Sequence, residues 1–114
     1  MLRKLFGAAP ASGGTAVSVD EARRKLDARE ALLIDVRERD EWQSGHVKGA
    51  KHIPLGELGA RLGEIPRDRE VLLLCRSGGR SGRATQLLQA QGFTRACNVE
   101  GGIMAWTGRG YPVV

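Results

Sequence analysis

Residues 75–81 read Cys-Arg-Ser-Gly-Gly-Arg-Ser, and the elements predicted on either side of them indicate the fold class. It follows the apolar run 71–74 and precedes a helical pattern over residues 81–91 in which Ala84, Leu87 and Leu88 share one face. A strand, a glycine-containing turn and a helix, in that order, aim backbone N–H groups and the positive end of a helix dipole at the mouth of the turn. Cys75 stands first in the turn, so we expect its thiolate to be stabilised there.

The charges near this turn point the same way. No Asp or Glu occurs between residues 71 and 99, a stretch that contains Arg76, Arg80, Arg83 and Arg95. Two interpretations of Cys75 compete: a small apolar thiol that ends a strand, and a nucleophile that attacks a small anion. The strand, the Gly-Gly turn, the arginines and the helix together favour the nucleophile, with its sulfur negative and exposed at the bottom of a bowl.

The composition is that of one globular domain. The chain has 114 residues, of which 41% are hydrophobic and 27% charged, and its net charge is +5. Aromatic residues make up only 4% and no run of basic residues occurs, so the charge does not favour nucleic-acid binding. No apolar run approaches the length of a membrane span. Two cysteines do not make a disulfide framework, which favours a reducing, cytoplasmic location.

The predicted organisation is a flexible tail over residues 1–14 and a domain over residues 15–114. An organelle-targeting role for the basic, acid-free start is an alternative to the tail. In the domain, hydrophobic patterns and capping signals predict an alternation of strands and helices. The strands are expected over 15–17, 31–36, 50–53, 70–74 and 95–99, and the helices over 18–28, 38–44, 55–65, 81–91 and from 101 onward.

This alternation is typical of an α/β domain with a mostly parallel sheet. Ligands of such sheets bind beyond the carboxyl ends of the strands. Cys75 and Asp35 lie at two of these ends, and Glu100 follows the last strand. We therefore expect these three polar groups to meet at one rim of the sheet.

Two further stretches complete a recognisable pattern. Residues 34–54 contain Ile-Asp-Val-Arg-Glu, Glu-Trp, Gly-His-Val, Gly-Ala and Ile-Pro, and residues 98–106 read Asn-Val-Glu-Gly-Gly-Ile-Met-Ala-Trp. Together with residues 75–81, and over about residues 15–114, they resemble the rhodanese-like family, and specifically its single-domain sulfurtransferases. The resemblance implies a central sheet of about five strands with helices on both faces.

The resemblance also implies a mechanism. The Cys75 thiolate attacks the sulfane sulfur of thiosulfate or a persulfide, and the resulting Cys75 persulfide passes its sulfur to cyanide or a thiol, a protein acceptor included. Arg76 and Arg80 would attract the anion, and no cofactor is implied. The alternative is a sulfur-carrier or docking module without turnover of its own. The implied persulfide-binding loop comprises Arg76, Ser77, Gly78, Gly79, Arg80 and Ser81.

The six residues from Cys75 to Arg80 also bear on the reaction. Sulfurtransferases of this family typically have a loop of six residues, whereas the related cell-cycle phosphatases have seven. The shorter loop should fit one sulfur atom better than a tetrahedral phosphate. We therefore expect negligible phosphatase activity.

Supporting roles are expected for Asp35 and Arg37. Asp35 either accepts hydrogen bonds from the loop N–H groups or caps the next helix from the end of its strand. Arg37 should pair with Glu38, Glu41 or Asp35 rather than with substrate.

The remaining candidates have structural interpretations. We expect His46 to be a hydrogen-bonding structural residue, Trp42 and Trp106 to pack in the core, and residues 101–102 to allow a close approach to the loop. Cys97 is interpreted as a core thiol, with a resolving cysteine as the alternative. The histidines and cysteines lack metal-ligand spacing, so no metal is expected.

Overall fold

The computed structural model describes residues 16–114, and the predictions for residues 1–14 lie outside this range. Strands and helices alternate, as predicted. Within residues 16–114, no helix is both long and apolar enough to span a bilayer. The elements are β1 (Ala16–Val17), α1 (Val19–Asp27), β2 (Ala31–Asp35), α2 (Arg39–Gln43), β3 (Lys51–His52), α3 (Leu55–Leu58), η2 (Leu62–Glu64), β4 (Glu70–Leu74), α4 (Gly79–Ala90), β5 (Ala96–Val99) and α5 (Gly102–Gly108).

The five strands form one sheet in the order β1-β5-β4-β2-β3, and every neighbouring pair is parallel. This confirms the predicted α/β class and the central parallel sheet. β4 lies in the middle, between β5 and β2. Because parallel strands end at the same edge, the residue after β4 reaches the centre of the carboxyl edge of the sheet.

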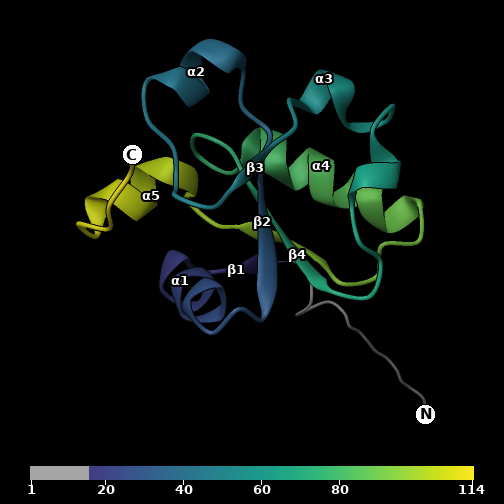
Figure 1. Ribbon diagram of the computed structural model, residues 1–114, viewed down its shortest axis with the longest axis horizontal. Helices are drawn as coiled ribbons and strands as arrows, with labels where there is room; N and C mark the ends of the chain where they lie inside the picture. The colour runs from purple at the N-terminus through teal and green to yellow at the C-terminus, as the bar shows by residue number, and fades with distance from the viewer. Residues whose placement is uncertain (1–15) are drawn as a thin grey trace.

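The two faces of the sheet carry separate apolar cores, because successive side chains of a strand point to opposite faces. In β4, Val71 and Leu73 belong to one core, whereas Leu72 and Leu74 belong to the other. The first core is covered by α3 and α4 and the second by α1 and α5, as Figure 1 shows. The strands of a sheet buried on both faces are apolar almost throughout, which explains the runs at 31–34 and 71–74.

Local signals placed most elements correctly, and β4 has its predicted bounds. The single helix expected over residues 55–65 is wrong: the segment forms α3 and the short 3-10 helix η2 instead. Its leucines do have helical spacing, but Gly56, Gly59 and Gly63 weaken a continuous helix.

The capping box of α1 is half formed. The Ser18 hydroxyl accepts the Glu21 N–H, but the Glu21 carboxylate pairs with Arg24.

Candidate active site

The loop that links β4 to α4 is held in shape by a glycine. Cys75 follows the last residue of β4, and α4 begins at Gly79, two residues earlier than predicted. Gly78 caps the helix with φ +112°, a left-handed conformation that residues other than glycine rarely adopt. The turn thereby reverses the chain within four residues and points its N–H groups back at Cys75.

The sulfur of Cys75 receives hydrogen bonds from this loop. The Gly78 N–H donates to Sγ at 3.1 Å, and the Ser81 hydroxyl oxygen lies 3.2 Å from Sγ. Burial acts to raise the pKa of the Cys75 thiol, but the Ser81 hydroxyl and the N–H groups of Ser81, Gly78 and Ser77 outweigh it. The net pKa of Cys75 is lowered, as expected for a thiolate nucleophile.

The expectation of an exposed sulfur is wrong. Cys75 is only 1% exposed and belongs to the core cluster beneath α4. The short loop folds closely over its own first residue, since the N–H groups that stabilise the sulfur must stand within hydrogen-bond distance of it. The same donors that lower the pKa of the thiol therefore also restrict access to it.

The opposite side of the loop packs on the start of α5. The Ile103 N–H donates to the Cys75 carbonyl at 2.8 Å, and the Met104 N–H donates to the Arg76 carbonyl at 3.0 Å. A Cβ on Gly102 would lie 2.4 Å from the Arg76 carbonyl oxygen, so only glycine fits there. The predicted close approach of residues 101–102 is confirmed. Because α5 takes up the loop carbonyls, the loop N–H groups remain directed toward the sulfur.

Although residues 71–99 contain no acid, an acid from another segment reaches the loop. Glu41, from α2, forms a bidentate ion pair with Arg80 at 2.7 and 2.9 Å. The Arg80 guanidinium is the main cause that lowers the pKa of Glu41 to about 2, and Glu41 in turn raises the pKa of Arg80. Glu41 lies 39 positions earlier in the chain, so no local pattern showed the pair. Arg76, in the loop, and Arg83, on α4, are both exposed.

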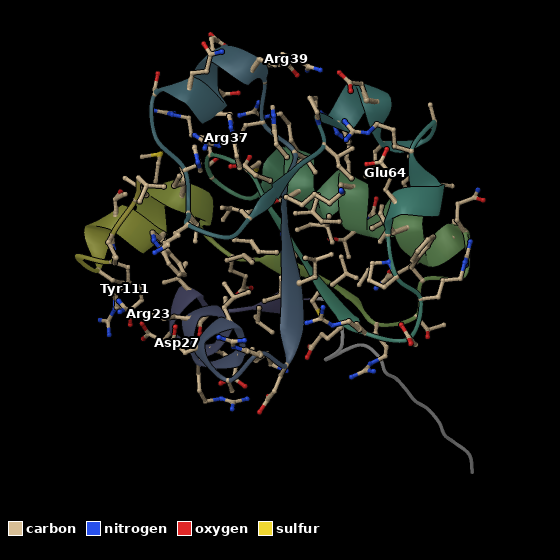
Figure 2. The ribbon with its side chains drawn as sticks, viewed as in Figure 1. Arg23, Asp27, Arg37, Arg39, Glu64 and Tyr111 are labelled. Carbon is tan, nitrogen blue, oxygen red and sulfur yellow. The ribbon has the colours of Figure 1, made fainter. Side chains whose placement is uncertain are left out.

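Asp35 does not contact the loop N–H groups. Its carboxylate, fully buried, accepts the Arg37 backbone N–H at 2.9 Å and three bonds from the Arg37 guanidinium at 2.8 to 3.0 Å. Arg37 also donates to the carbonyls of Glu41 and Gly45, and Figure 2 shows it below α2. Of the three partners expected for Arg37, Asp35 forms the ion pair. The Asp35 carboxylate caps the turn that follows β2, through the Arg37 N–H, and does not bind the N–H groups of the loop.

Cys75, Asp35 and Glu100 share an edge of the sheet, but within residues 16–114 each of them has its own partners. Asp35 pairs in register with Leu74, and Arg37 takes up its carboxylate. Glu100 is exposed, and its backbone N–H bonds to the Val17 carbonyl. The common rim was predicted correctly, but its polar groups have separate partners.

Asn98 is a site residue that the sequence reasoning did not single out. It lies on β5, with its side-chain oxygen 2.6 Å from the Ser81 hydroxyl and its Nδ2–H donating to the Gly78 carbonyl at 3.1 Å. A polar residue inside an otherwise apolar strand that ends at the active edge is the signal that could have pointed to it.

The aromatic residues divide. Trp106 is buried and donates its indole N–H to the Pro112 carbonyl, as expected of a core residue. Trp42 is not in either core; it is half-buried and stacks on His46 and His52 with centroid distances of 3.6 and 4.7 Å. The predicted structural role of His46 agrees with the contact between its Nδ1 and the Trp42 carbonyl at 2.9 Å.

Cys97 lies on the other face of the sheet from Cys75. It belongs to the core beneath α1 and α5 and pairs in register with Leu72. Cys75 is three residues beyond Leu72, which separates the two cysteines by about 10 Å along the strand direction. A disulfide needs Cα atoms within about 7 Å. This geometry supports the core-thiol interpretation over the resolving cysteine.

The protein is therefore an α/β domain in which a cysteine with a lowered pKa lies inside an N–H-lined loop at the carboxyl edge of a parallel sheet. The family model of the rhodanese-like domain matches the sequence over residues 18–109. The chain therefore belongs to the rhodanese-like domain family.

Known relatives agree with this assignment. A sulfurtransferase of Allochromatium vinosum is 40% identical over 93 residues, which cover 82% of this chain and 87% of that protein. The crystal structure of a rhodanese-related protein of Thermoplasma volcanium matches with a TM-score of 0.82 at 30% identity, covering 88% of this chain and 97% of that one.

The human single-domain sulfurtransferase TSTD1 matches with a TM-score of 0.75 at 31% identity, covering 82% and 96% of the two chains. Two Bacillus subtilis relatives are longer, and this chain spans 51% and 64% of their lengths. The predicted family is thus confirmed, and it contains enzymes that transfer sulfur.

Proposed function

We propose that this protein moves a sulfane sulfur from thiosulfate or a persulfide donor to cyanide or a thiol through a persulfide on Cys75. The observation that carries the proposal is the environment of Sγ: donors from Gly78 and Ser81 at 3.1 and 3.2 Å, and a lowered pKa. A thiolate is the form of sulfur that attacks sulfur. The same donors suit a persulfide, which is also anionic.

In the first half-reaction the Cys75 thiolate attacks the outer, sulfane sulfur of thiosulfate. A bond forms between Sγ and that sulfur while the S–S bond of thiosulfate breaks, and sulfite leaves with the electron pair. The product is a Cys75 persulfide whose negative charge lies on the outer sulfur. A persulfide donor reacts in the same way and releases a thiolate.

In the second half-reaction an acceptor nucleophile attacks the outer sulfur. With cyanide, a carbon–sulfur bond forms, the S–S bond of the persulfide breaks, and the Cys75 thiolate returns as thiocyanate leaves. With a thiolate acceptor the product is a new persulfide. No oxidant or reductant is consumed in either step.

The loop residues have distinct proposed roles. The N–H groups of Ser77, Gly78 and Ser81 and the Ser81 hydroxyl hold the negative sulfur, and exposed Arg76 attracts the anionic donor. Arg80 braces the loop through its pair with Glu41 instead of binding the donor directly. Gly79, the first residue of α4, completes the turn.

Asp35 and Arg37 act at one remove in this proposal. Their buried ion pair ties the end of β2 to the Glu41 carbonyl within α2 and to the Gly45 carbonyl just beyond α2, and α2 carries the Glu41 side chain to Arg80. The site lies entirely within residues 15–114, to which we assign the activity. Because the reaction needs a reduced thiol, we assign it to the cytoplasm.

Mass spectrometry after incubation with thiosulfate tests the proposal. The wild type should gain one sulfur atom on the peptide that contains Cys75, and cyanide should remove it as thiocyanate. Cys75→Ser should gain none, and Cys97→Ser is the matched control that should load like the wild type. Sulfur loading of Cys75→Ser would overturn the proposal. So would a wild type that loads neither from thiosulfate nor from a low-molecular-weight persulfide. Loading without thiocyanate release would favour the sulfur-carrier alternative.

A further inference from the structure

The Ser81 hydroxyl stands between two acceptors. Its oxygen lies 3.2 Å from the Cys75 sulfur and 2.6 Å from Asn98 Oδ1. A hydroxyl has one proton, so it donates to only one of these atoms at a time. Ser81 is itself buried, and water does not readily replace either bond. The state of the sulfur and the hydrogen bond of Asn98 are therefore coupled.

The orientation of the Asn98 amide follows from its other contact. Nδ2–H donates to the Gly78 carbonyl at 3.1 Å, and this leaves Oδ1, an acceptor only, directed at Ser81. The Gly78 carbonyl also accepts the Gly82 N–H at 3.0 Å in the first turn of α4. Loss of the Asn98 side chain therefore leaves the Gly78 carbonyl bonded, while the Ser81 hydroxyl loses its alternative acceptor.

We propose that Asn98 is a positioning residue that takes the Ser81 hydroxyl bond whenever Sγ is uncharged and thereby opposes formation of the Cys75 thiolate. When the thiol ionises, its proton leaves to solvent and the Ser81 O–H turns from Asn98 Oδ1 to Sγ. Asn98 Oδ1 then loses its partner, and this loss reduces the gain from stabilising the thiolate.

The same device favours the loaded enzyme, a consequence that rests on the proposed function. In a Cys75 persulfide, Sγ is bonded to carbon and to the outer sulfur and carries no charge. The Ser81 hydroxyl then returns to Asn98, and the backbone N–H groups remain for the charged outer sulfur. Asn98 thus shifts the balance from the free thiolate toward the persulfide.

Substitution of Asn98 leaves the other charged groups near the Cys75 sulfur in place. Arg80, on α4 beside Ser81, acts electrostatically on Cys75 and is paired with Glu41 from α2. From α5 the contacts are the Ile103 and Met104 N–H groups, which bind loop carbonyls. A change in the pKa of Cys75 on substitution of Asn98 therefore reports on the Ser81 hydroxyl.

Titration of the Cys75 thiolate by its ultraviolet absorbance tests the proposal, in a Cys97→Ser background that removes the second thiol. Asn98→Leu should lower the pKa of Cys75 by about half to one unit, a three- to tenfold rise in the thiolate-to-thiol ratio, as expected from one neutral hydrogen bond. A residue that merely held the loop in shape would have the opposite effect, because a looser loop would withdraw the Gly78 N–H and raise the pKa.

Two further variants make the result specific. Gln89→Leu is the matched control: the Gln89 amide also joins α4 to β5, at the Ala96 carbonyl, but does not touch the loop, so the pKa of Cys75 should not change. Ser81→Ala should raise the pKa of Cys75, and Asn98→Leu added to it should have no further effect.

The inference is overturned if Asn98→Leu raises the pKa of Cys75 or leaves it unchanged, or if its effect persists without the Ser81 hydroxyl. Asn98→Ala provides the same test if the leucine variant does not fold. Because the titration requires no sulfur donor, its result stands whether or not Cys75 loads from thiosulfate.

Discussion

Gly102→Ala should disrupt the site without changing any residue that touches the sulfur. The new Cβ would lie 2.4 Å from the Arg76 carbonyl oxygen and 2.6 Å from that of Cys75, closer than carbon and oxygen approach. Gly102 also has φ +61°, a left-handed conformation. The loop and the start of α5 must therefore move apart.

The size of the effect follows from two costs. A left-handed conformation costs a residue other than glycine roughly 1–2 kcal/mol. Separation of α5 from the loop weakens the bonds from Ile103 to the Cys75 carbonyl and from Met104 to the Arg76 carbonyl, each worth about 0.5–1.5 kcal/mol. We expect the free energy of unfolding to fall by about 2–5 kcal/mol.

Urea unfolding, followed by circular dichroism and extrapolated to water, measures this loss. Gly110→Ala is the matched control, because Gly110 also has a left-handed φ of +79° but a Cβ there would meet nothing within 4 Å. It should lose only the conformational cost, about 1–2 kcal/mol. Equal losses in the two variants would show that the Cβ of residue 102 does not push the loop and α5 apart. Gly102→Ala alone should also raise the pKa of Cys75, since the loop N–H groups lose their support.

Other expected outcomes concern charge, the second cysteine, the reaction and access. Glu41→Gln should release Arg80 from its ion pair, so that its guanidinium can attract the donor, and should lower KM for thiosulfate about two- to fivefold, the worth of a partly exposed ion pair. An unchanged KM would show that the pair with Glu41 is not what keeps Arg80 from the donor. Because the pKa of Glu41 lies at about 2 rather than 4.5, its ionised form stabilises the fold above pH 4.5 and this stability is lost as the pH falls toward 2; acid unfolding of Glu41→Gln should lack that component. Cys97→Ser should leave turnover nearly unchanged, and loss of turnover in a folded variant would restore the resolving role. An aryl phosphate should be hydrolysed negligibly beside sulfur transfer, and a comparable rate would contradict the assignment from loop length. For each alkylating reagent, the rate with Cys75 can be divided by its rate with a free thiol. This ratio should be larger for iodoacetamide than for a bulky maleimide, because Cys75 is 1% exposed. Equal ratios would show that the loop opens freely.

Local chemistry accounts for the parts of the site that were predicted. The N–H and hydroxyl donors to the sulfur come from positions 77, 78 and 81, within six residues of Cys75, so a strand-turn-helix pattern was sufficient to place them. The apolar run before Cys75 predicted β4 for the same reason. The helix predicted over residues 55–65 also fails for a local reason, because three glycines interrupt leucines that have helical spacing.

Contacts between distant segments account for what was missed. Glu41 reaches Arg80 across 39 positions and Asn98 reaches Ser81 across 17, and both depend on the strand order β5-β4-β2. The pairing of Asp35 with Arg37 is different, because the two residues are neighbours in the chain and it was among the predicted pairs; of the two roles predicted for Asp35, the contact with the loop N–H groups is the one not found.

Stabilisation of a cysteine thiolate at the end of a buried strand can be predicted from the sequence, because the groups that stabilise it are its chain neighbours. The acceptors that compete for those groups and the access to the sulfur depend instead on how the strands and helices pack. Three features arise where separate strands and helices meet: the ion pair of Arg80 with Glu41, the competition of Asn98 for the Ser81 proton, and the burial of Cys75. The energies of such contacts depend on distances that no single stretch of chain specifies.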